Sequence, residues 1–510
     1  MRIVHLRIND ADSGESVPVR LRITNEEGQI FPPLGRAAEF PAAGEIPVGC
    51  HLRVREAIWY AIDGNCEVPL PTGVPLRIQA TRGPEYACLD QRVTLGTGQL
   101  SLRMSVSRQF QPRQRGWIAG DGRVHGRSAH DAALEAAAEG LDLLNLQAAV
   151  TDIRSEHDGR IYSLPIGLAA FSGQQPALCW KGVMVIVNTL NRHPVLGSLS
   201  LLNCHRPVFP LVFGGPDDTD DWSLSDWCAQ CHRKGGLVVW ADPFSGTGPA
   251  FGGEALIATL LGQVDAVEWS GSTKTQPLLP WCYRLWNLGL CQPLLGVSGD
   301  HRQARPPGYP RTYARVRDAS AWTYRDWIEA IRQGECYTTN GPLLDWEWIS
   351  DTDSLDHQPE SSGFGLRAWA DSVLPITTLE LLHQGKVVAS APAVSSQANR
   401  WSARIEWRFS SESAGWWAVR CSGPAGSPWH DQPLFAHSAP LVPTGQRGGN
   451  VLSDSMLAPL RQAVEATADW LATVARFRDV RNREQHLQRC QAVLERLAHW
   501  QAVPGQFREK

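Results

Sequence analysis

The pattern of apolar and polar positions changes twice along the chain. In Val17–Ile23 alternate residues are apolar, and turn-forming runs flank the segment, which predicts a β-hairpin. Similar short strands follow, so residues 1–112 are predicted to form a β-sandwich-like module. Across 113–342, short apolar runs alternate with amphipathic helical stretches. This alternation predicts a mostly parallel sheet, either open or closed into a barrel.

The remaining third of the chain contains strands and then helices. Residues 343–445 return to the strand pattern, which predicts a second β-sandwich-like module. Across 446–510, apolar residues recur at helical spacing on two faces, as expected for two packed amphipathic helices. The predicted fold class is therefore α/β, with two β modules beside the central region and a helical tail.

Composition narrows the classes of function and partner. Of 510 residues, 43% are hydrophobic and 20% are charged, which is typical of a globular protein. The formal net charge of -4 indicates no nucleic-acid or anionic-membrane surface, so we expect a small molecule or a protein as partner. No apolar run is long enough for a transmembrane helix. The first residues lack a secretory pattern, so a cytoplasmic location is expected, with the 12 cysteines mostly as reduced, buried thiols.

The segment GDGRVHG contains the first candidate chemistry. Asp121, Arg123 and His125 lie at i, i+2 and i+4, so in a regular strand all three would project to one side. A carboxylate and two imidazoles at this spacing would converge on one metal ion. The middle residue is an arginine, whose guanidinium stays protonated and has no lone pair to offer. Taken alone, the motif is more typical of a salt-bridged strand than of a metal site.

Two further strands end in residues that can bind or transfer protons. Asp242 follows the apolar run GGLVVWA, and Asp300 and His301 follow PLLGVSG. Chemistry in parallel α/β folds gathers beyond such strand ends, although each of these segments is also consistent with a simple turn. Glu268 lies within the apolar strand VDAVEWSG. It therefore has a buried role, either in a site or in a pair with an internal arginine.

A third motif, Cys228-Ala-Gln-Cys231-His232, fits the attachment pattern of c-type haem. It lies in a predicted amphipathic helix just before a core strand. We interpret the two cysteines as neighbouring buried thiols and expect no haem.

Several segments together resemble one family. GWIAGDGRVHG resembles the opening strand of the CehA/McbA-type metallohydrolases, a branch of the PHP (polymerase and histidinol phosphatase) superfamily, which read G-D-x-H-x-H at this point. Matching stretches follow in order: LNRHPVLGSLSLLN, WCAQCHRKGGLVVWADP, VDAVEWSG, YRLWNLGLCQPLLGVSGDH and WIEAIRQGECYTTNGPLL. The resemblance covers residues 1–445 in outline and is densest from 116 to 345. It implies a distorted, PHP-like β/α barrel with a metal centre at the strand carboxyl ends, used to hydrolyse phosphoesters or other small esters.

The chain departs from the family pattern at the positions that would hold metal. The first histidine of the family motif falls on Arg123, and a glutamate falls near Leu190. Two further histidines fall on Ser198 and Asp242, and the late Gly-Ser/Thr-Asp is out of register by one residue at 298–300. A binuclear centre needs about five or more protein ligands, more than remain here.

Two hypotheses follow from these departures. In the first, the chain is a non-catalytic binding protein without a cofactor, and an ion pair between Arg123 and Asp242, shared with Asp121, fills the vacated centre. Its pocket comprises Asp121, Arg123, His125, Ser198, Asp242, Glu268, Asp300 and His301. In the second, the chain is an active hydrolase with one divalent metal ion (zinc, manganese or iron). Its ligands would be Asp121, His125, Asp242 and either Asp300 or His301.

Overall fold

The computed structural model describes most of the 510 residues as a mixed α/β fold. The described ranges are 1–35, 51–54, 57–154, 161–215, 218–244, 251–271, 278–300, 305–349, 364–396, 400–409, 415–425, 432–443 and 453–502.

Two sheets near the N-terminus pack as a sandwich. The first has the order β5–β1–β8, and the second has the order β3–β4–β2–β6–β7. Val4, Leu6 and Ile8, at alternate positions of β1, are fully buried and share a core with the apolar face of β2. The alternation therefore predicted the sandwich correctly. The hairpin predicted around Val17–Ile23 is not formed: β1 and β2 lie in different sheets, and β2 pairs with β4 and β6. Across the turn that follows β2, only an isolated bridge joins Thr24 to Ile30. The strands are β1 (Arg2–Asp10), β2 (Val19–Asn25), β3 (His51–Val54), β4 (Ala57–Ile62), β5 (Asn65–Leu70), β6 (Pro75–Thr81), β7 (Leu89–Thr94) and β8 (Ser101–Val106).

The centre of the molecule is one large sheet, whose first part follows the order β17–β16–β15–β14–β13–β10–β9. Strand β10 runs parallel to β9 and β13, and β16 runs parallel to β15 and β17. Strand β14 is antiparallel to both of its neighbours, so the predicted parallel sheet is interrupted there. The strands are β9 (Trp117–His125), β10 (Leu143–Arg154), β13 (Val183–His193), β14 (Gly197–Leu202), β15 (Leu237–Ala241), β16 (Ala266–Trp269) and β17 (Leu294–Gly296), with β11 (Ile161–Ile166) and β12 (Leu178–Trp180) paired beside β10 and β13.

The described strands do not form the expected closed barrel. Strand β19 (Arg311–Arg315) occupies part of the second edge of β9, pairing antiparallel with it from Trp117 to Gly120. The short strand β18 (Gly299–Asp300), which follows β17, pairs with β9 only at its last two residues, Val124 and His125. The sheet thus curls until its two ends meet at one point, but β19 prevents a continuous ring.

The sheet continues beyond β19 into the C-terminal half. Its order is β9–β19–β20–β28–β27–β23–β24, and a separate four-stranded sheet has the order β21–β22–β26–β25. The predicted boundary at residue 342 lies between β20 and β21. The strands are β20 (Cys336–Thr339), β21 (Leu343–Ile349), β22 (Phe364–Ser372), β23 (Thr378–His383), β24 (Lys386–Pro392), β25 (Val394–Ser395), β26 (Trp401–Phe409), β27 (Trp417–Ser422) and β28 (Phe435–Ser438).

Helix α5 (Tyr324–Arg332) closes the inner face of the curled sheet. It begins with the predicted capping box, in which Thr323 and Asp326 each bond the other's backbone N–H. Trp327 packs against β9 at Gly120, where a Cβ atom would lie only 2.6 Å from the indole. The glycine before Asp121 is therefore required by the close approach of α5.

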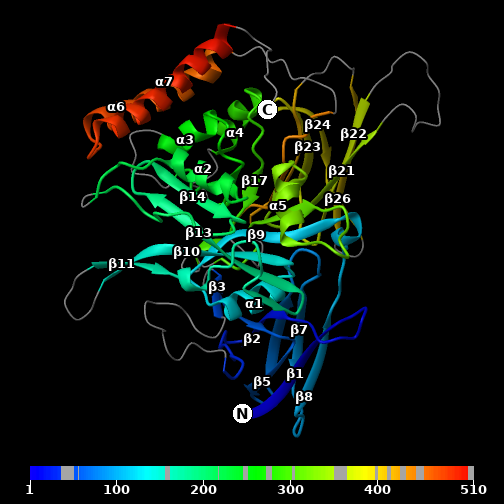
Figure 1. The fold of residues 1–510 in the computed structure, drawn as a ribbon. Coiled ribbons are helices and arrows are strands. Elements are labelled where there is room, and N and C mark those ends of the chain that lie inside the picture. The colour runs from blue at the N-terminus through cyan, green and yellow to red at the C-terminus, as the bar shows by residue number, and fades with distance from the viewer. Residues whose placement is uncertain are drawn as a thin grey trace.

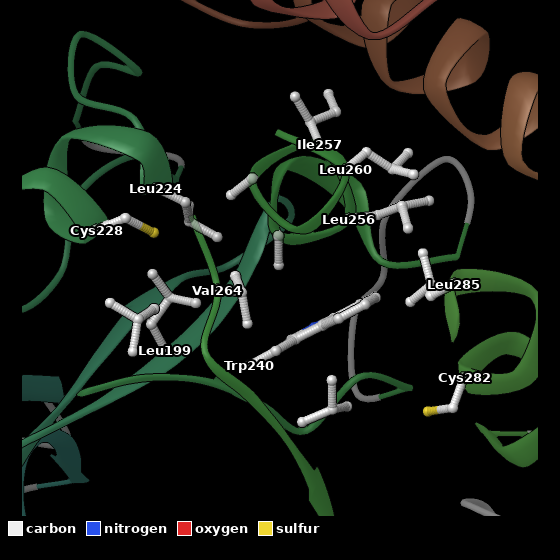
Figure 2. Packing of buried hydrophobic residues seen from close by; sticks show 14 of the residues in the cluster. Leu199, Leu224, Cys228, Trp240, Leu256, Ile257, Leu260, Val264, Cys282 and Leu285 are labelled. Atoms are coloured by element: carbon white, nitrogen blue, oxygen red, sulfur yellow. The ribbon is translucent and has the colours of Figure 1, made fainter. Parts of the chain in front are cut away.

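Three helices cover the outer face around β15. They are α2 (Leu224–Arg233), α3 (Gly253–Leu260) and α4 (Leu278–Asn287), and they enclose Trp240 from β15 (Figure 2). Helix α1 (Ala129–Ala138) packs on β10 and β13 instead.

Two long helices, α6 (Asp454–Thr473) and α7 (Val480–Ala502), form the predicted C-terminal helical pair. They pack on α3, at the opposite end of the molecule from the N-terminal sandwich (Figure 1). A buried ion pair between His486 Nδ1 of α7 and Glu254 Oε1 of α3, at 2.7 Å, connects the helical pair to α3. In the described part of the chain, no helix has the length and apolarity needed to cross a membrane.

Candidate functional site

Arg123 is the centre of a buried ion-pair network at the carboxyl ends of β9, β15 and β16. Its Nε lies 2.9 and 3.0 Å from the two carboxylate oxygens of Glu268, and its Nη2 lies 2.6 Å from Asp242 Oδ1. The Arg123 side chain is 4% exposed and that of Glu268 is 1% exposed, whereas that of Asp242 is 37% exposed. The predicted pair between Arg123 and Asp242 is therefore present. Glu268, for which pairing with an internal arginine was one interpretation, is a second partner of Arg123.

The electrostatics of this network favour a charged guanidinium. Burial alone would lower the pKa of Arg123, but Asp242 and Glu268 outweigh burial and raise it above its ordinary value. Burial raises the pKa of Glu268 to about 7, although Arg123 opposes the rise. The network thus keeps a fixed positive charge inside the fold and holds it against two carboxyl groups.

Asp121 does not join Arg123, contrary to the prediction. The pairing of β9 with β10 shifts register between Leu144 and Leu146, so that β9 has an extra residue opposite Asn145. Such a bulge breaks the regular alternation of side chains that the i, i+2, i+4 argument assumed. Glu268 therefore takes the position beside Arg123 that was expected for Asp121.

Backbone N–H groups hold the Asp121 carboxylate instead. Oδ1 accepts from the N–H groups of Arg123 and Ser298, at 3.1 and 3.2 Å, and Oδ2 accepts from Gly308 at 2.7 Å. Burial raises the pKa of Asp121, and these hydrogen bonds work against the rise. The carboxylate thus connects the end of β9 to two other segments, those of Ser298 and Gly308.

His125 lies beside Arg123 at the end of β9, and the short strand after β17 pairs with it. The imidazole Nε2 of His125 is 3.4 Å from Arg123 Nη1. Asp300 pairs through its backbone with His125. The side chain of Asp300 and the whole of His301 lie outside the described residues, so their predicted roles stay predictions.

The turn after β15 places Asp242 beside Arg123. Asp242 has a left-handed backbone with φ of 44°, which aspartate tolerates better than most residues. Its backbone N–H donates to Glu268 Oε2 at 3.1 Å. Glu268 therefore bonds both to Arg123 and to the turn that carries the second partner of Arg123.

Two serines of β14 face this network, and only one was predicted. Ser198 is buried and pairs through its backbone with Ala241, the residue before Asp242. Ser200, two positions along and thus on the same face, donates from Oγ to Glu268 Oε1 at 2.8 Å. Sequence reasoning missed Ser200, although alternate serines in the apolar strand SLSLL were a usable signal.

A second polar network links the site to the opposite end of the sheet. Asn145 Nδ2 donates to the Asp121 carbonyl at 3.0 Å, and its Oδ1 accepts from the Tyr324 hydroxyl at 2.6 Å. Asn188 Nδ2 donates to Asn145 and to Tyr324, and its Oδ1 accepts from the Asn203 backbone. All the side chains that make these bonds are buried, so the network fixes β9, β10 and β13 relative to α5.

The described donor atoms do not fit a metal ion. No group of three or more His, Cys, Asp or Glu side chains in the described ranges is arranged to hold one. Asp242 and Glu268 face a guanidinium, and three backbone N–H groups surround Asp121. A cation at this place would have to displace Arg123, whose charge repels it.

The Cys-x-x-Cys-His motif lies on α2, as predicted. Cys228 and Cys231 are fully buried, and His232 pairs with Asp265 at 2.8 Å. All cysteines of the described ranges are free thiols.

Comparisons with known proteins add no family assignment. No family model matches the chain, and no curated protein matches it. Among solved structures, PsfC from Pseudomonas syringae PB-5123 is 16% identical, covers 42% of this chain and 88% of its own, and gives a TM-score of 0.27. The lesion-specific endonuclease PfuEndoQ from Pyrococcus furiosus is 11% identical, covers 42% of this chain and 56% of its own, and gives a TM-score of 0.28. Likenesses this weak support no argument about activity, which must come from the site itself.

Proposed function

We propose that this chain is a non-catalytic member of the PHP superfamily, related to the CehA/McbA type, that binds a ligand or partner at the strand ends. The proposed family relationship rests on the sequence motifs that resemble it. The observation that supports loss of catalysis is the buried Arg123 guanidinium, held by Asp242 and Glu268. In a metal-dependent hydrolase, acids at this place would bind a metal ion. Here Asp242 and Glu268 are paired with the guanidinium of Arg123 instead.

The charge balance of the site argues against phosphoester substrates. One guanidinium faces two carboxyl groups, and a third carboxyl group, that of Asp121, lies at the end of the same strand. The site therefore offers no excess positive charge to an anionic phosphate. Asp242 and His125 are the partly exposed polar groups of the network. A neutral or cationic ligand that donates hydrogen bonds fits this arrangement better than a phosphate.

Metal content tests the proposal most directly. Full-length protein, purified without chelator and without a metal-affinity column, is analysed for zinc, manganese and iron. We expect well under one equivalent of each. We also expect no hydrolysis of bis(p-nitrophenyl) phosphate after any of the three metals is added, and no increase in melting temperature with millimolar inorganic phosphate.

The opposite result would support the alternative, an active mononuclear hydrolase. One tightly bound equivalent, together with metal-dependent hydrolysis, would overturn the non-catalytic proposal. Its ligands would then include His125 and one of Asp300 and His301.

A further inference from the structure

Two buried cysteines from different elements lie in contact. Cys204 follows β14 and Cys231 lies on α2, and their Sγ atoms are 3.4 Å apart. Both residues are at most 1% exposed. The pairing crosses the Cys-x-x-Cys spacing of the sequence, because the partner of Cys231 is Cys204, 27 residues away.

Gly236 makes room for this contact. A Cβ atom at Gly236 would lie 2.4 Å from Cys204 Sγ and 2.5 Å from Cys231 Sγ. Any side chain there would collide with both sulfurs. The backbone just before β15 therefore packs directly on the thiol pair, and the absence of a side chain at this point lets the two sulfurs stay in contact.

A cavity of about 850 Å³ lies against the same backbone. Its lining includes Asn203 and His232, the sequence neighbours of Cys204 and Cys231. It also includes Gly236, where an added Cβ atom would collide with both sulfurs. Gly236 precedes β15 whereas Asp242 follows it, so this cavity and the Arg123 network lie at opposite ends of one strand. The cavity wall thus contains neighbours of both cysteines, and at Gly236 no side chain shields their sulfurs.

We propose that Cys204 and Cys231 are a modification site at which a peroxide converts the two thiols into a disulfide. One thiol attacks hydrogen peroxide and becomes a sulfenic acid, with release of one water. The second thiol attacks this sulfur, the S–S bond forms, and a second water leaves. Two thiols and one peroxide thus give one disulfide and two waters. The bridge ties the end of β14 to α2 beneath the cavity, so the shape of the cavity follows the redox state.

The environment of the sulfurs sets the rate of this reaction. Burial, followed by the Cys204 thiol and nearby Asp265 and Cys228, raises the pKa of Cys231 well above its ordinary value. The thiolate is the reactive form, so little of Cys231 is reactive at neutral pH. The pair reacts slowly and needs sustained exposure to oxidant, whereas the proximity of the sulfurs favours the bridge over further oxidation once the sulfenic acid forms.

Mapping the bridge in the full-length protein tests the proposal. The protein is incubated with hydrogen peroxide, remaining thiols are blocked with N-ethylmaleimide, and the digest is analysed by mass spectrometry without reductant. We expect a cross-linked peptide pair that contains Cys204 and Cys231, is two hydrogen atoms lighter than the separate peptides, and disappears after dithiothreitol. The oxidised protein should also melt at a higher temperature, reversibly, because the bridge closes a loop.

Variants separate this pair from other thiols. Cys228→Ser alters a buried cysteine one turn away on the same helix and should leave the bridge unchanged, whereas Cys204→Ser should abolish it. Because the mapping uses the unaltered chain, it stands even where Cys204→Ser fails to fold. The proposal is overturned by a bridge between Cys228 and Cys231, by sulfinic acid at either sulfur without a bridge, or by both thiols remaining free under conditions that oxidise exposed Cys88 and Cys179.

Discussion

Arg123 on β9 and Glu268 on β16 form the more deeply buried of the two ion pairs of the candidate site, with Nε 2.9 Å from Oε1. The two residues are 145 positions apart in the chain, and only the curling of the sheet brings them together. Formation of this pair therefore depends on the curled fold as well as on the residues of the site. Its position, beside Asp242 and His125, accounts for the arginine within an otherwise metal-like motif.

Removal of the guanidinium should destabilise the protein strongly. Arg123→Ala leaves Glu268 and Asp242 without their counter-charge inside the fold, which typically costs about 3–5 kcal/mol. Equilibrium unfolding in urea measures the loss. Arg367→Ala is the control, because Arg367 also bridges two carboxylates from a β-strand but is 45% exposed. That change should cost less than about 1 kcal/mol. Equal losses for the two variants would refute a special role for the buried pair.

Arg123→His introduces the residue type found in the motif that the sequence resembles, but it should not produce hydrolysis. The new imidazole would stand near His125, whereas Leu190 and Ser198 still offer no ligand atoms of the expected kinds. The assay is hydrolysis of bis(p-nitrophenyl) phosphate with added zinc, manganese or iron. Arg123→Gln, which removes the charge without adding an imidazole, is the matched control. Metal-dependent turnover by the histidine variant alone would show that this one substitution silenced the site.

Local patterns predicted the elements better than the site. Alternation in Val17–Ile23 and the Thr323–Asp326 capping box depend on neighbours in sequence, and both features are present. The Arg123–Asp242 pair was also predictable, because both residues fall at facing strand ends, where the motifs that the sequence resembles have histidines. The separation of the Asp121 side chain from that of Arg123 was not predictable from the sequence. It depends on a bulge of β9 opposite Asn145, and Asn145 lies on β10, which is a neighbour of β9 only in space.

The prediction of a closed barrel was wrong for a similar reason. The apolar runs predict strands, but they do not say which strand occupies the second edge of β9. Strand β19 reaches that edge from nearly 200 residues away and pairs with Gly120 through Thr312. Competition for an edge is a long-range property, so a barrel and an interrupted sheet have the same local pattern.

Buried His437 should make stability depend on pH. Burial lowers its pKa to about 3, and its contacts suit the neutral ring: Nδ1–H donates to the Ser438 carbonyl at 2.7 Å, and Nε2 accepts from Tyr283 OH at 2.8 Å. In the unfolded chain its pKa is about 6.5, so below that pH the unfolded state binds the proton first. This contribution to stability is complete above about pH 6.5 and falls by about 2 kcal/mol on going to about pH 5.

The difference between the unaltered chain and His437→Gln isolates this effect. Glu268, whose pKa is raised to about 7, changes stability in the opposite direction, but it is present in both proteins and cancels. Urea unfolding near pH 8 gives the pH-independent cost of the substitution. If the difference between the two proteins is the same near pH 8 and near pH 5, His437 is not buried in its neutral form.

Gly236→Ala tests the packing around the thiol pair. The added methyl group would lie 2.4 and 2.5 Å from the sulfurs of Cys204 and Cys231, and 2.8 Å from the Leu202 carbonyl. Overpacking of this kind costs about 1–3 kcal/mol, because the surrounding core must shift. Gly96→Ala is the control, since its Cβ would have no heavy atom within 4 Å, and its effect should be near zero. Urea unfolding of both variants measures the difference.

Combining Gly236→Ala with Cys204→Ala should recover part of the lost stability, because one of the colliding sulfurs is then absent. If the double variant is no more stable than Gly236→Ala alone, contact with the Cys204 sulfur is not the source of the strain.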